Sequence, residues 1–149
     1  MDGRATIVGE GSGSTHRSPF GDSLRWITGE EATGGAYSLH ERTAPPGAAS
    51  VPHTHSRVSE AFYVLEGAFA FELDEQTVTA RPGDYVHAPA GASHAWRVTS
   101  ENAARALVLF APSVPLAFFE EIDAAMNETP GTQPDLRQLA AINEKYGLA

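Results

Sequence analysis

The chain of 149 residues contains no cysteine, and this absence excludes disulfide bonds and thiolate chemistry. Any metal that the chain holds must therefore use nitrogen and oxygen ligands. The sequence has no apolar run of about eighteen residues, so no segment is expected to span a membrane. Its beginning also lacks a basic stretch followed by an apolar one, which is the pattern of a signal peptide. Together these absences favour a cytoplasmic protein.

Positive charge is scarce. Ten Lys and Arg residues stand against nineteen Asp and Glu residues, which gives a formal net charge of −9. A surface of this sign repels nucleic acid and anionic lipid, so we expect neither as a partner. The length fits one compact domain with its own core. Fourteen glycines and ten prolines suit many turns between short strands.

The chain does contain a group of potential metal ligands between Gly47 and Gly67. His53 and His55 are two residues apart, and in a β-strand this spacing directs both side chains to the same side. A polar turn over 56–59 and a second strand, EAFYVLEG, then bring Glu60 back beside them. Two imidazoles and a carboxylate that converge in this way are ligands for a divalent first-row metal.

A second stretch, residues 83–94, supplies a third histidine. It contains a strand, a turn rich in Pro and Gly, and His94 as the first residue of the strand HAWRV. His94 would complete a site of three histidines and one glutamate. The residues leave the metal open among Fe, Mn, Ni, Co and Zn. They also leave open whether His40, His87 and Tyr37 are packing residues or contact a substrate.

These two stretches resemble the two signature motifs of the cupins, which are small β-barrel proteins. The first motif, G-x5-H-x-H-x4-E-x6-G, and the second, G-x5-P-x-G-x2-H, are both matched without a gap. The resemblance implies metal ligands at His53, His55, Glu60 and His94. One position departs from the pattern: the second motif usually ends in Asn, and here that position is Val98. The departure affects the polarity of a pocket wall and not the ligand set.

The spacing of short strands predicts an all-β antiparallel barrel, a jelly roll, with one or two C-terminal helices. We divide the chain into a flexible N-terminal segment (1–19), the barrel (20–112) and a C-terminal helical extension (113–149). A helix is expected to begin at Pro115 and a second to run over 134–146. These helices either only cover the barrel, or place Phe118 and Phe119 over one of its mouths.

The predicted strands also indicate which side chains surround the metal. Phe62 and Val64 share a face with Glu60, while Trp96 and Val98 share a face with His94. A cavity with such an apolar, aromatic lining suits a flat organic substrate that carries oxygen donors. Glu60 is expected to act as a ligand and also as a base that accepts a proton from a substrate hydroxyl.

The runs PHTHSRVSEAFYVLEG and TVTARPGDYVHAPAGASHAW, with the later FFEEI, resemble small bacterial cupins similar to quercetin dioxygenases. This resemblance implies a metal-dependent dioxygenase that opens a flavonol or another oxygenated ring, with dioxygen as co-substrate. It also implies a homodimer, in which the strand LRWIT (24–28) could pair across the interface as a free edge. Two alternatives remain: a non-redox metal-dependent isomerase or cyclase, and a binding module without turnover. The intact ligand set argues against the binding module.

Overall fold

The computed structural model describes residues 3–127 and 134–148. Its strands and helices follow one another in the order β1 (Thr15–Arg17), β2 (Ser23–Thr28), α1 (Glu30–Thr33), β3 (Ser38–Ala44), β4 (Ser59–Glu66), β5 (Phe69–Leu73), β6 (Gln76–Ala80), β7 (Tyr85–Ala88), β8 (His94–Val98), β9 (Ala104–Ala111), α2 (Leu116–Asn127) and α3 (Leu136–Lys145). No helix in these two ranges is long and apolar enough to cross a membrane.

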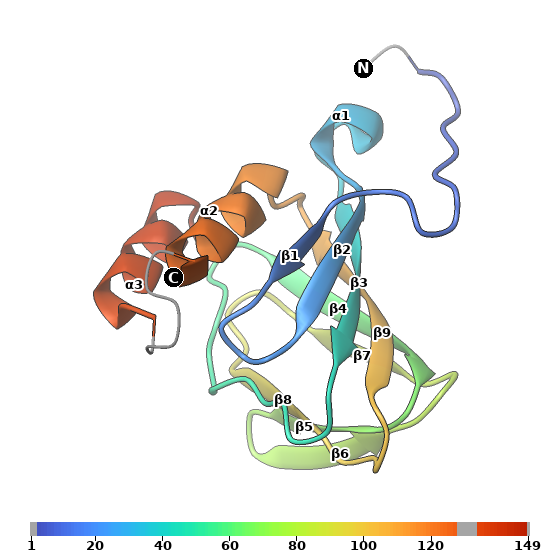
Figure 1. Cartoon of the computed structure of the whole chain (residues 1–149), viewed down its shortest axis with the longest axis vertical. Helices are drawn as coiled ribbons and strands as arrows, with labels where there is room; N and C mark the ends of the chain where they lie inside the picture. Colours follow the sequence, from blue (N-terminus) through green and yellow to red (C-terminus); the bar gives the residue numbers. More distant parts are fainter. Residues whose placement is uncertain (1–2, 128–133, 149) are drawn as a thin grey trace.

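The strands form two antiparallel sheets (Figure 1). The larger sheet has the strand order β1-β2-β3-β9-β4-β7, and the smaller has the order β6-β5-β8. The main apolar core takes side chains from both sheets, including Phe62 and Val108 from the larger and Phe71 and Trp96 from the smaller. This arrangement confirms the predicted all-β jelly roll with two C-terminal helices.

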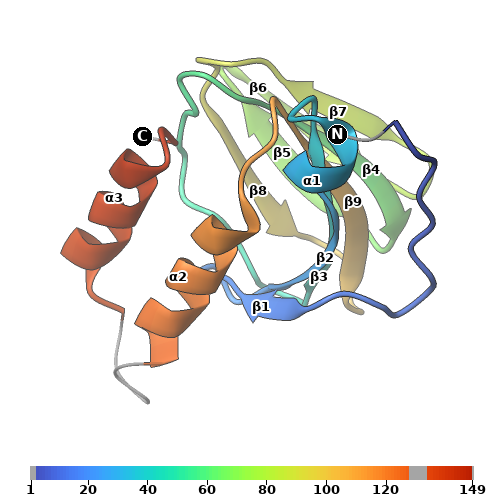
Figure 2. The same cartoon turned by 90° about the horizontal axis from the view of Figure 1, so that it is seen from above.

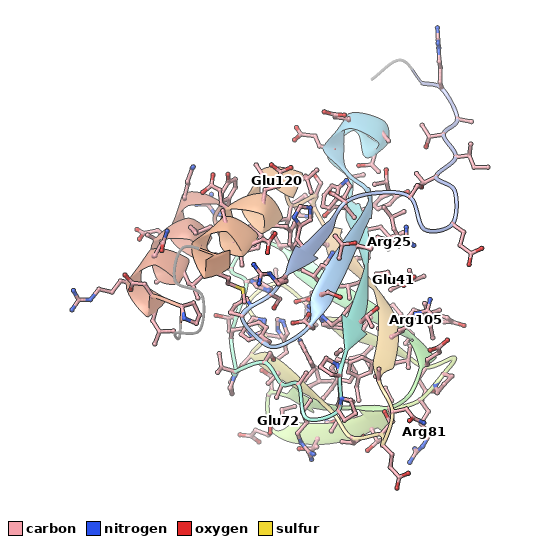
Figure 3. All side chains as sticks on the ribbon, in the orientation of Figure 1. Arg25, Glu41, Glu72, Arg81, Arg105 and Glu120 are labelled. Atoms are coloured by element: carbon pink, nitrogen blue, oxygen red, sulfur yellow. The ribbon has the colours of Figure 1, made fainter. Side chains whose placement is uncertain are left out.

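Strand β3 shows how the alternation of a strand separates charges between the two faces of a sheet. On its outer face, Glu41 forms ion pairs with Arg25 of β2 at 3.5 Å and with Arg105 of β9 at 3.2 Å. The three side chains lie together in Figure 3. On its inner face, His40 and Arg42 are buried. A charged and a titratable side chain of β3 therefore point into the molecule.

Helices α2 and α3 lie on one flank of the sheets, whereas the chain that leads into β1 runs along the other (Figures 1 and 2). Phe119 of α2 is only 6% exposed, and its ring contacts Trp26 and Phe110. Helix α3 begins at the N-cap Asp135, whose carboxylate accepts a hydrogen bond from the Arg137 amide. Gly147, just beyond its end, takes a φ of 71°, which favours glycine.

Two local expectations are corrected by the structure. His53 and His55 lie in a loop and not in a strand. His53 forms one isolated bridge to His94, and His55 forms none. Strand β2 is not a free edge, since it pairs with β1 on one side and β3 on the other. The division of the chain into three parts stays a prediction, and within its first part residues Thr15–Arg17 form β1 and Arg17 bonds to Asp123 of α2 at 3.1 Å.

Candidate metal centre

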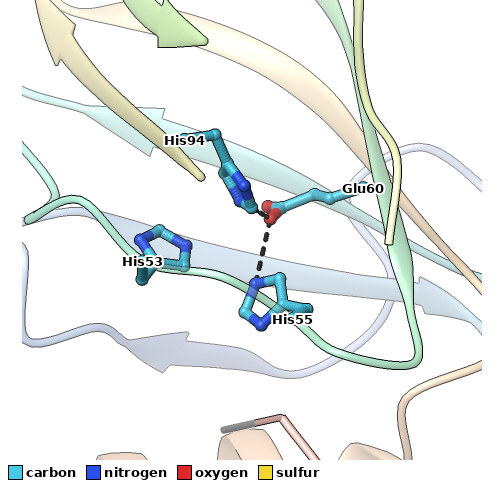
Figure 4. Close-up of side chains that lie close together, drawn as sticks. All are labelled: His53, His55, Glu60 and His94. Carbon is cyan, nitrogen blue, oxygen red and sulfur yellow. Dashed lines mark hydrogen bonds and ion pairs between the residues drawn. The ribbon is translucent and has the colours of Figure 1, made fainter. Parts of the chain in front are cut away.

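The four side chains of the metal-ligand cluster, which are His53, His55, Glu60 and His94, converge at one end of the core (Figure 4). One potential ligand atom from each lies within 4.8 Å of the others. The loop between β3 and β4 supplies His53 and His55, β4 supplies Glu60, and the first residue of β8 supplies His94. The structure therefore brings together the four residues that the sequence singled out.

The distances within the cluster suit a single cation. Oε2 of Glu60 lies 2.9 Å from Nε2 of His94 and 3.2 Å from Nε2 of His55. Two ligand atoms at right angles, each about 2.1 Å from a metal, would be about 3.0 Å apart. Atoms at this spacing are close enough to bind one cation together.

Each histidine of the cluster is fixed by a backbone carbonyl. Nδ1 of His53 donates to the carbonyl oxygen of Val51 at 2.7 Å, and Nδ1 of His94 donates to the carbonyl oxygen of Ala92 at 3.1 Å. Nδ1 of His55 donates to the carbonyl oxygen of Leu148 at 3.2 Å, from the segment beyond α3. A carbonyl only accepts, so each Nδ1 carries a proton, and Nε2 is the ring nitrogen through which each histidine could bind a metal. Such outer hydrogen bonds orient metal-binding histidines.

Burial and hydrogen bonding shift the pKa values of the cluster residues in opposite directions. Burial alone would raise the pKa of Glu60, but hydrogen bonds from His55 and His94 outweigh it and lower that pKa. Burial lowers the pKa of His53. For His94, burial acts downward, yet the hydrogen bond to Glu60 raises its pKa overall. The carboxylate is therefore ionised at neutral pH, as a metal ligand must be.

A second polar assembly lies on the inner side of β3, and we name it the inner polar group: Asp22, His40 and Arg42. Nε of Arg42 donates to Oδ2 of Asp22 at 2.8 Å, and both residues are buried. The guanidinium also lies over the ring of Trp96, 4.6 Å from its centroid. The sequence left the role of His40 open and did not indicate that this face of the strand points inward.

The residues expected to line a cavity are all in the core. Phe62, Val64, Trp96 and Val98 are at most 6% exposed, so their contact with a substrate stays a prediction. A groove of about 580 Å³ lies next to the loop that carries His55, between Ser56 and the end of α3, and none of the four lines it.

The other undecided residues lie at the surface. His87 is exposed on β7 and its ring stacks on Tyr85, and Tyr37 is 38% exposed.

Comparisons with known proteins agree with this geometry. A family model described as a cupin domain matches residues 40–110. Over 100 residues, or 66% of this chain, the sequence is 35% identical to a quercetin 2,3-dioxygenase of Bacillus subtilis (strain 168). That match spans only 29% of the length of the Bacillus protein.

Among solved structures, KdgF from Halomonas sp. is similar with a TM-score of 0.56 and 27% identity, over 62% of this chain and 81% of that one. A predicted oxalate decarboxylase from Thermotoga maritima has a TM-score of 0.66 and 20% identity, over 72% of this chain and 99% of that one. The second likeness concerns the fold alone. The matched motifs, the two-sheet fold and the sequence match together show that the chain belongs to the cupin superfamily and is similar to quercetin 2,3-dioxygenase.

Proposed function

We propose that this protein is a metal-dependent dioxygenase that acts on a flavonol-like molecule or another oxygenated aromatic or enol compound. The observation that carries the proposal is the metal-ligand cluster, in which three imidazoles fixed by backbone carbonyls and one carboxylate lie close enough to bind a single cation. The similarity of the cupin region to a quercetin 2,3-dioxygenase favours this chemistry over others on the same fold.

A bound first-row metal such as Fe, Mn, Ni, Co or Zn would supply Lewis acidity and, where it is redox-active, a site for dioxygen. His53, His55, Glu60 and His94 would hold the metal, and substrate and dioxygen would take the coordination positions that these four residues leave open. The residues of the chain orient those positions, because the carbonyls of Val51, Ala92 and Leu148 fix the planes of the three imidazoles.

Glu60 is proposed as a ligand and as the base that takes the proton of a substrate hydroxyl. Its side chain is 3% exposed, so a proton that it accepts is held away from bulk water. The hydrogen bonds that lower its pKa come from Nε2 of His55 and His94, and these are the atoms that would face a metal.

The proposed substrate contacts are Phe62, Val64, Trp96 and Val98, which lie on the same inner surface as the cluster. Their apolar side chains would hold the rings of a flat molecule whose oxygen atoms bind at the metal. A cytoplasmic location and a homodimer complete the proposal. Since β2 is covered on both sides, a dimer would use a surface other than the free edge of that strand.

The test combines metal analysis with oxygen uptake. The purified protein is expected to carry about one first-row divalent metal per chain, and His55→Ala is expected to lose most of it. Metal-free protein is then reconstituted with each metal in turn, and flavonols and catechols are supplied in an oxygen electrode. His87→Ala serves as the matched control, since His87 is a surface histidine outside the cluster.

Uptake of oxygen that depends on the metal and on His55 would support the dioxygenase. Substrate conversion without oxygen and with zinc would instead establish the isomerase or cyclase alternative. Binding of a flavonol with neither conversion nor uptake would reduce the protein to a binding module.

A further inference from the structure

The outer side of the larger sheet is apolar over four of its strands, β3, β9, β4 and β7. Residues that pair directly across neighbouring strands share one side of a sheet, so the register shows which side chains lie together. We name this surface the outer apolar face. It consists of two rows of directly paired residues, which are Leu39, Leu109 and Ala61, and then Leu107, Tyr63 and Tyr85.

The side chains of the outer apolar face are in contact with solvent although their character favours burial. Tyr63 is 46% exposed and Tyr85 is 64% exposed, and the three leucines of the face are half-buried. The opposite side of the same strands forms the main core, so these strands are apolar on both sides. An antiparallel sheet that faces water on one side normally carries polar residues there. The outer apolar face therefore has the character of an interaction surface.

The smaller sheet shows the polar pattern that such a solvated side has. On its outer side, Glu72 of β5 pairs with Thr77 of β6. In the next row, Thr79 of β6 and Arg97 of β8 lie on either side of an alanine of β5. All four of these polar side chains are exposed. The two sheets thus differ on their outer sides, and the larger one is suited to contact another apolar surface.

The distribution of charge favours a second copy of the chain as the partner. Two copies with a net charge of −9 repel each other unless they meet where no net charge lies. The outer apolar face has no charged member, and its charged neighbour Glu41 forms ion pairs with Arg25 and Arg105. A two-fold axis between the two rows would also place the tyrosines of one copy on the leucines of the other. Interface cores are rich in aromatic residues and poor in charge.

The segment 5–8, which we name the apolar tail, offers apolar surface beyond this face. It runs along the flank of the sheets that lies away from α2 and α3 (Figure 2). Thr6 and Val8 line a groove of about 490 Å³ against β2 and α1. Ile7 lies between them in an extended chain, points to the other side and is 95% exposed. An isoleucine is among the residues most often buried, and a second copy would cover it.

The area that a stable dimer needs indicates that both surfaces take part. Strands about 4.8 Å apart and rows about 7 Å apart give the outer apolar face about 300 Å² in projection. A stable interface buries about 800 Å² of accessible surface on each partner. The face alone falls short of this area, and the apolar tail adds contacts outside it.

We propose that the outer apolar face packs against the same face of a second copy, and that the apolar tail of each copy contacts the other. The inference rests on the homodimer of the proposed function and names the surface that forms it. Glu60 lies on β4 with its side chain directed to the inner side of the sheet. The interface therefore leaves the metal-ligand cluster in the interior of each copy.

The test measures the dissociation constant of the dimer by sedimentation of the full-length, zinc-loaded protein over a range of concentrations. Wild-type protein is expected to be dimeric at micromolar concentration. Tyr63→Lys places a charge in the apolar centre of the interface and is expected to weaken the dimer at least about 100-fold. Ile7→Lys removes one apolar contact from each copy and is expected to weaken it about tenfold. Both changes lower the net negative charge, so general repulsion between copies cannot cause the loss.

Leu136→Lys is the matched control. Leu136 is 76% exposed on α3, on the flank of the molecule away from the apolar tail (Figure 1), and its change is expected to leave the dissociation constant unchanged. Each variant is expected to keep the zinc content of wild type and the Tm of the dilute monomer. If Tyr63→Lys does not fold, Ile7→Lys still tests the proposal, because a side chain that is 95% exposed does not support the fold of its own chain.

A dimer of unchanged strength in Tyr63→Lys or in Ile7→Lys would overturn the proposal, and so would an equal weakening by Leu136→Lys. Wild-type protein that stays monomeric at every concentration would overturn it together with the homodimer. Metal content and oxygen uptake are measured separately from dimerisation, so a failed dioxygenase assay would leave this result interpretable.

Discussion

The metal-ligand cluster and the inner polar group share one inner surface, yet their polar atoms are paired very differently. In the cluster, each Nδ1 donates to a backbone carbonyl and Glu60 is contacted by two imidazoles. In the inner polar group, one ion pair is formed and four polar atoms have no hydrogen-bond partner among residues 3–127 and 134–148. The polar atoms of the first assembly are therefore paired within the protein, whereas those of the second are paired only in part.

The two assemblies therefore differ in how far the protein itself orients and pairs their polar groups. The cluster is oriented before a metal binds, because the carbonyls fix each imidazole independently of the others. The inner polar group contains buried atoms that no described residue pairs, and such atoms lower the stability of the fold.

The largest expected effect is on the ion pair of the inner polar group. Arg42→Met leaves the Asp22 carboxylate buried without its partner, so the free energy of unfolding should fall by about 3–5 kcal/mol. The double variant with Asp22→Asn removes both charges and should recover most of that loss. Urea unfolding at neutral pH measures both values.

Arg105→Met is the matched control for Arg42→Met. Arg105 also contacts a carboxylate, that of Glu41, but its side chain is 34% exposed, so the loss should stay below about 1 kcal/mol. Equal losses in the two single variants would contradict the assignment of Arg42 to a desolvated pair. They would also weaken the contrast between the inner and outer faces of β3.

The fold and the metal-ligand cluster were accessible to sequence reasoning because both depend on local signals. Two local signals predict that the four side chains meet: the spacing of His53, His55 and Glu60, and the Pro-Gly turn before His94. This prediction holds whether the residues lie in strands or in loops. His53 and His55 were expected in a strand and lie in a loop, yet the bridge from His53 to His94 still brings them to the same centre.

The inner polar group was not accessible in this way. In β3, Leu39 and Glu41 share one face and His40 and Arg42 the other, so each face carries a charged residue and the sequence does not decide which is buried. The structure buries the second, because Asp22, from a segment 20 residues away, neutralises Arg42. Such a pairing is a tertiary contact that no local pattern encodes. The hydrogen bond from His55 to Leu148, 93 residues apart, was missed for the same reason.

A smaller effect should appear in the pH dependence of stability. The pKa of His40 is about 3 in the folded protein, below its ordinary value of 6.5, so the unfolded chain binds the extra proton first as pH falls. The stability that depends on neutral His40 is complete above pH 6.5 and is lost as the pH falls. Between pH 6.5 and 5 the loss should reach about 2 kcal/mol in wild type.

His40→Leu should remove this part of the slope, as measured by urea unfolding of the metal-free protein at several pH values. The charges that act on His40 are those of Arg42 and Glu60, and neither is changed in the variant. His53 has its own lowered pKa and contributes the same slope to both proteins, so it cancels in the comparison. Identical slopes would show that His40 titrates normally and is not enclosed.

The smallest predicted effect concerns the hydrogen bond that joins the cluster to the end of the described chain. Nδ1 of His55 donates to the Leu148 carbonyl, and the Leu148 side chain is 3% exposed in the main core. A chain that ends at Tyr146 loses both contacts. Its affinity for a divalent metal should fall about tenfold, because His55 is no longer held with Nε2 toward the metal. Competition with a chelator measures the change.

Leu148→Ala distinguishes the two contacts, because it shortens the side chain and keeps the carbonyl. Both variants should be less stable than wild type, since each removes buried apolar surface. Only the shortened chain should bind metal more weakly, and its His55 should lose the preference for the Nδ1–H tautomer, which nitrogen-15 NMR of the imidazoles reports. An equal fall in metal affinity in both variants would mean that the end of the chain supports the cluster by packing alone. The Leu148 carbonyl would then not orient His55, and only two of the three histidines would be fixed by backbone carbonyls. The cluster and the inner polar group would differ less in how their polar atoms are paired.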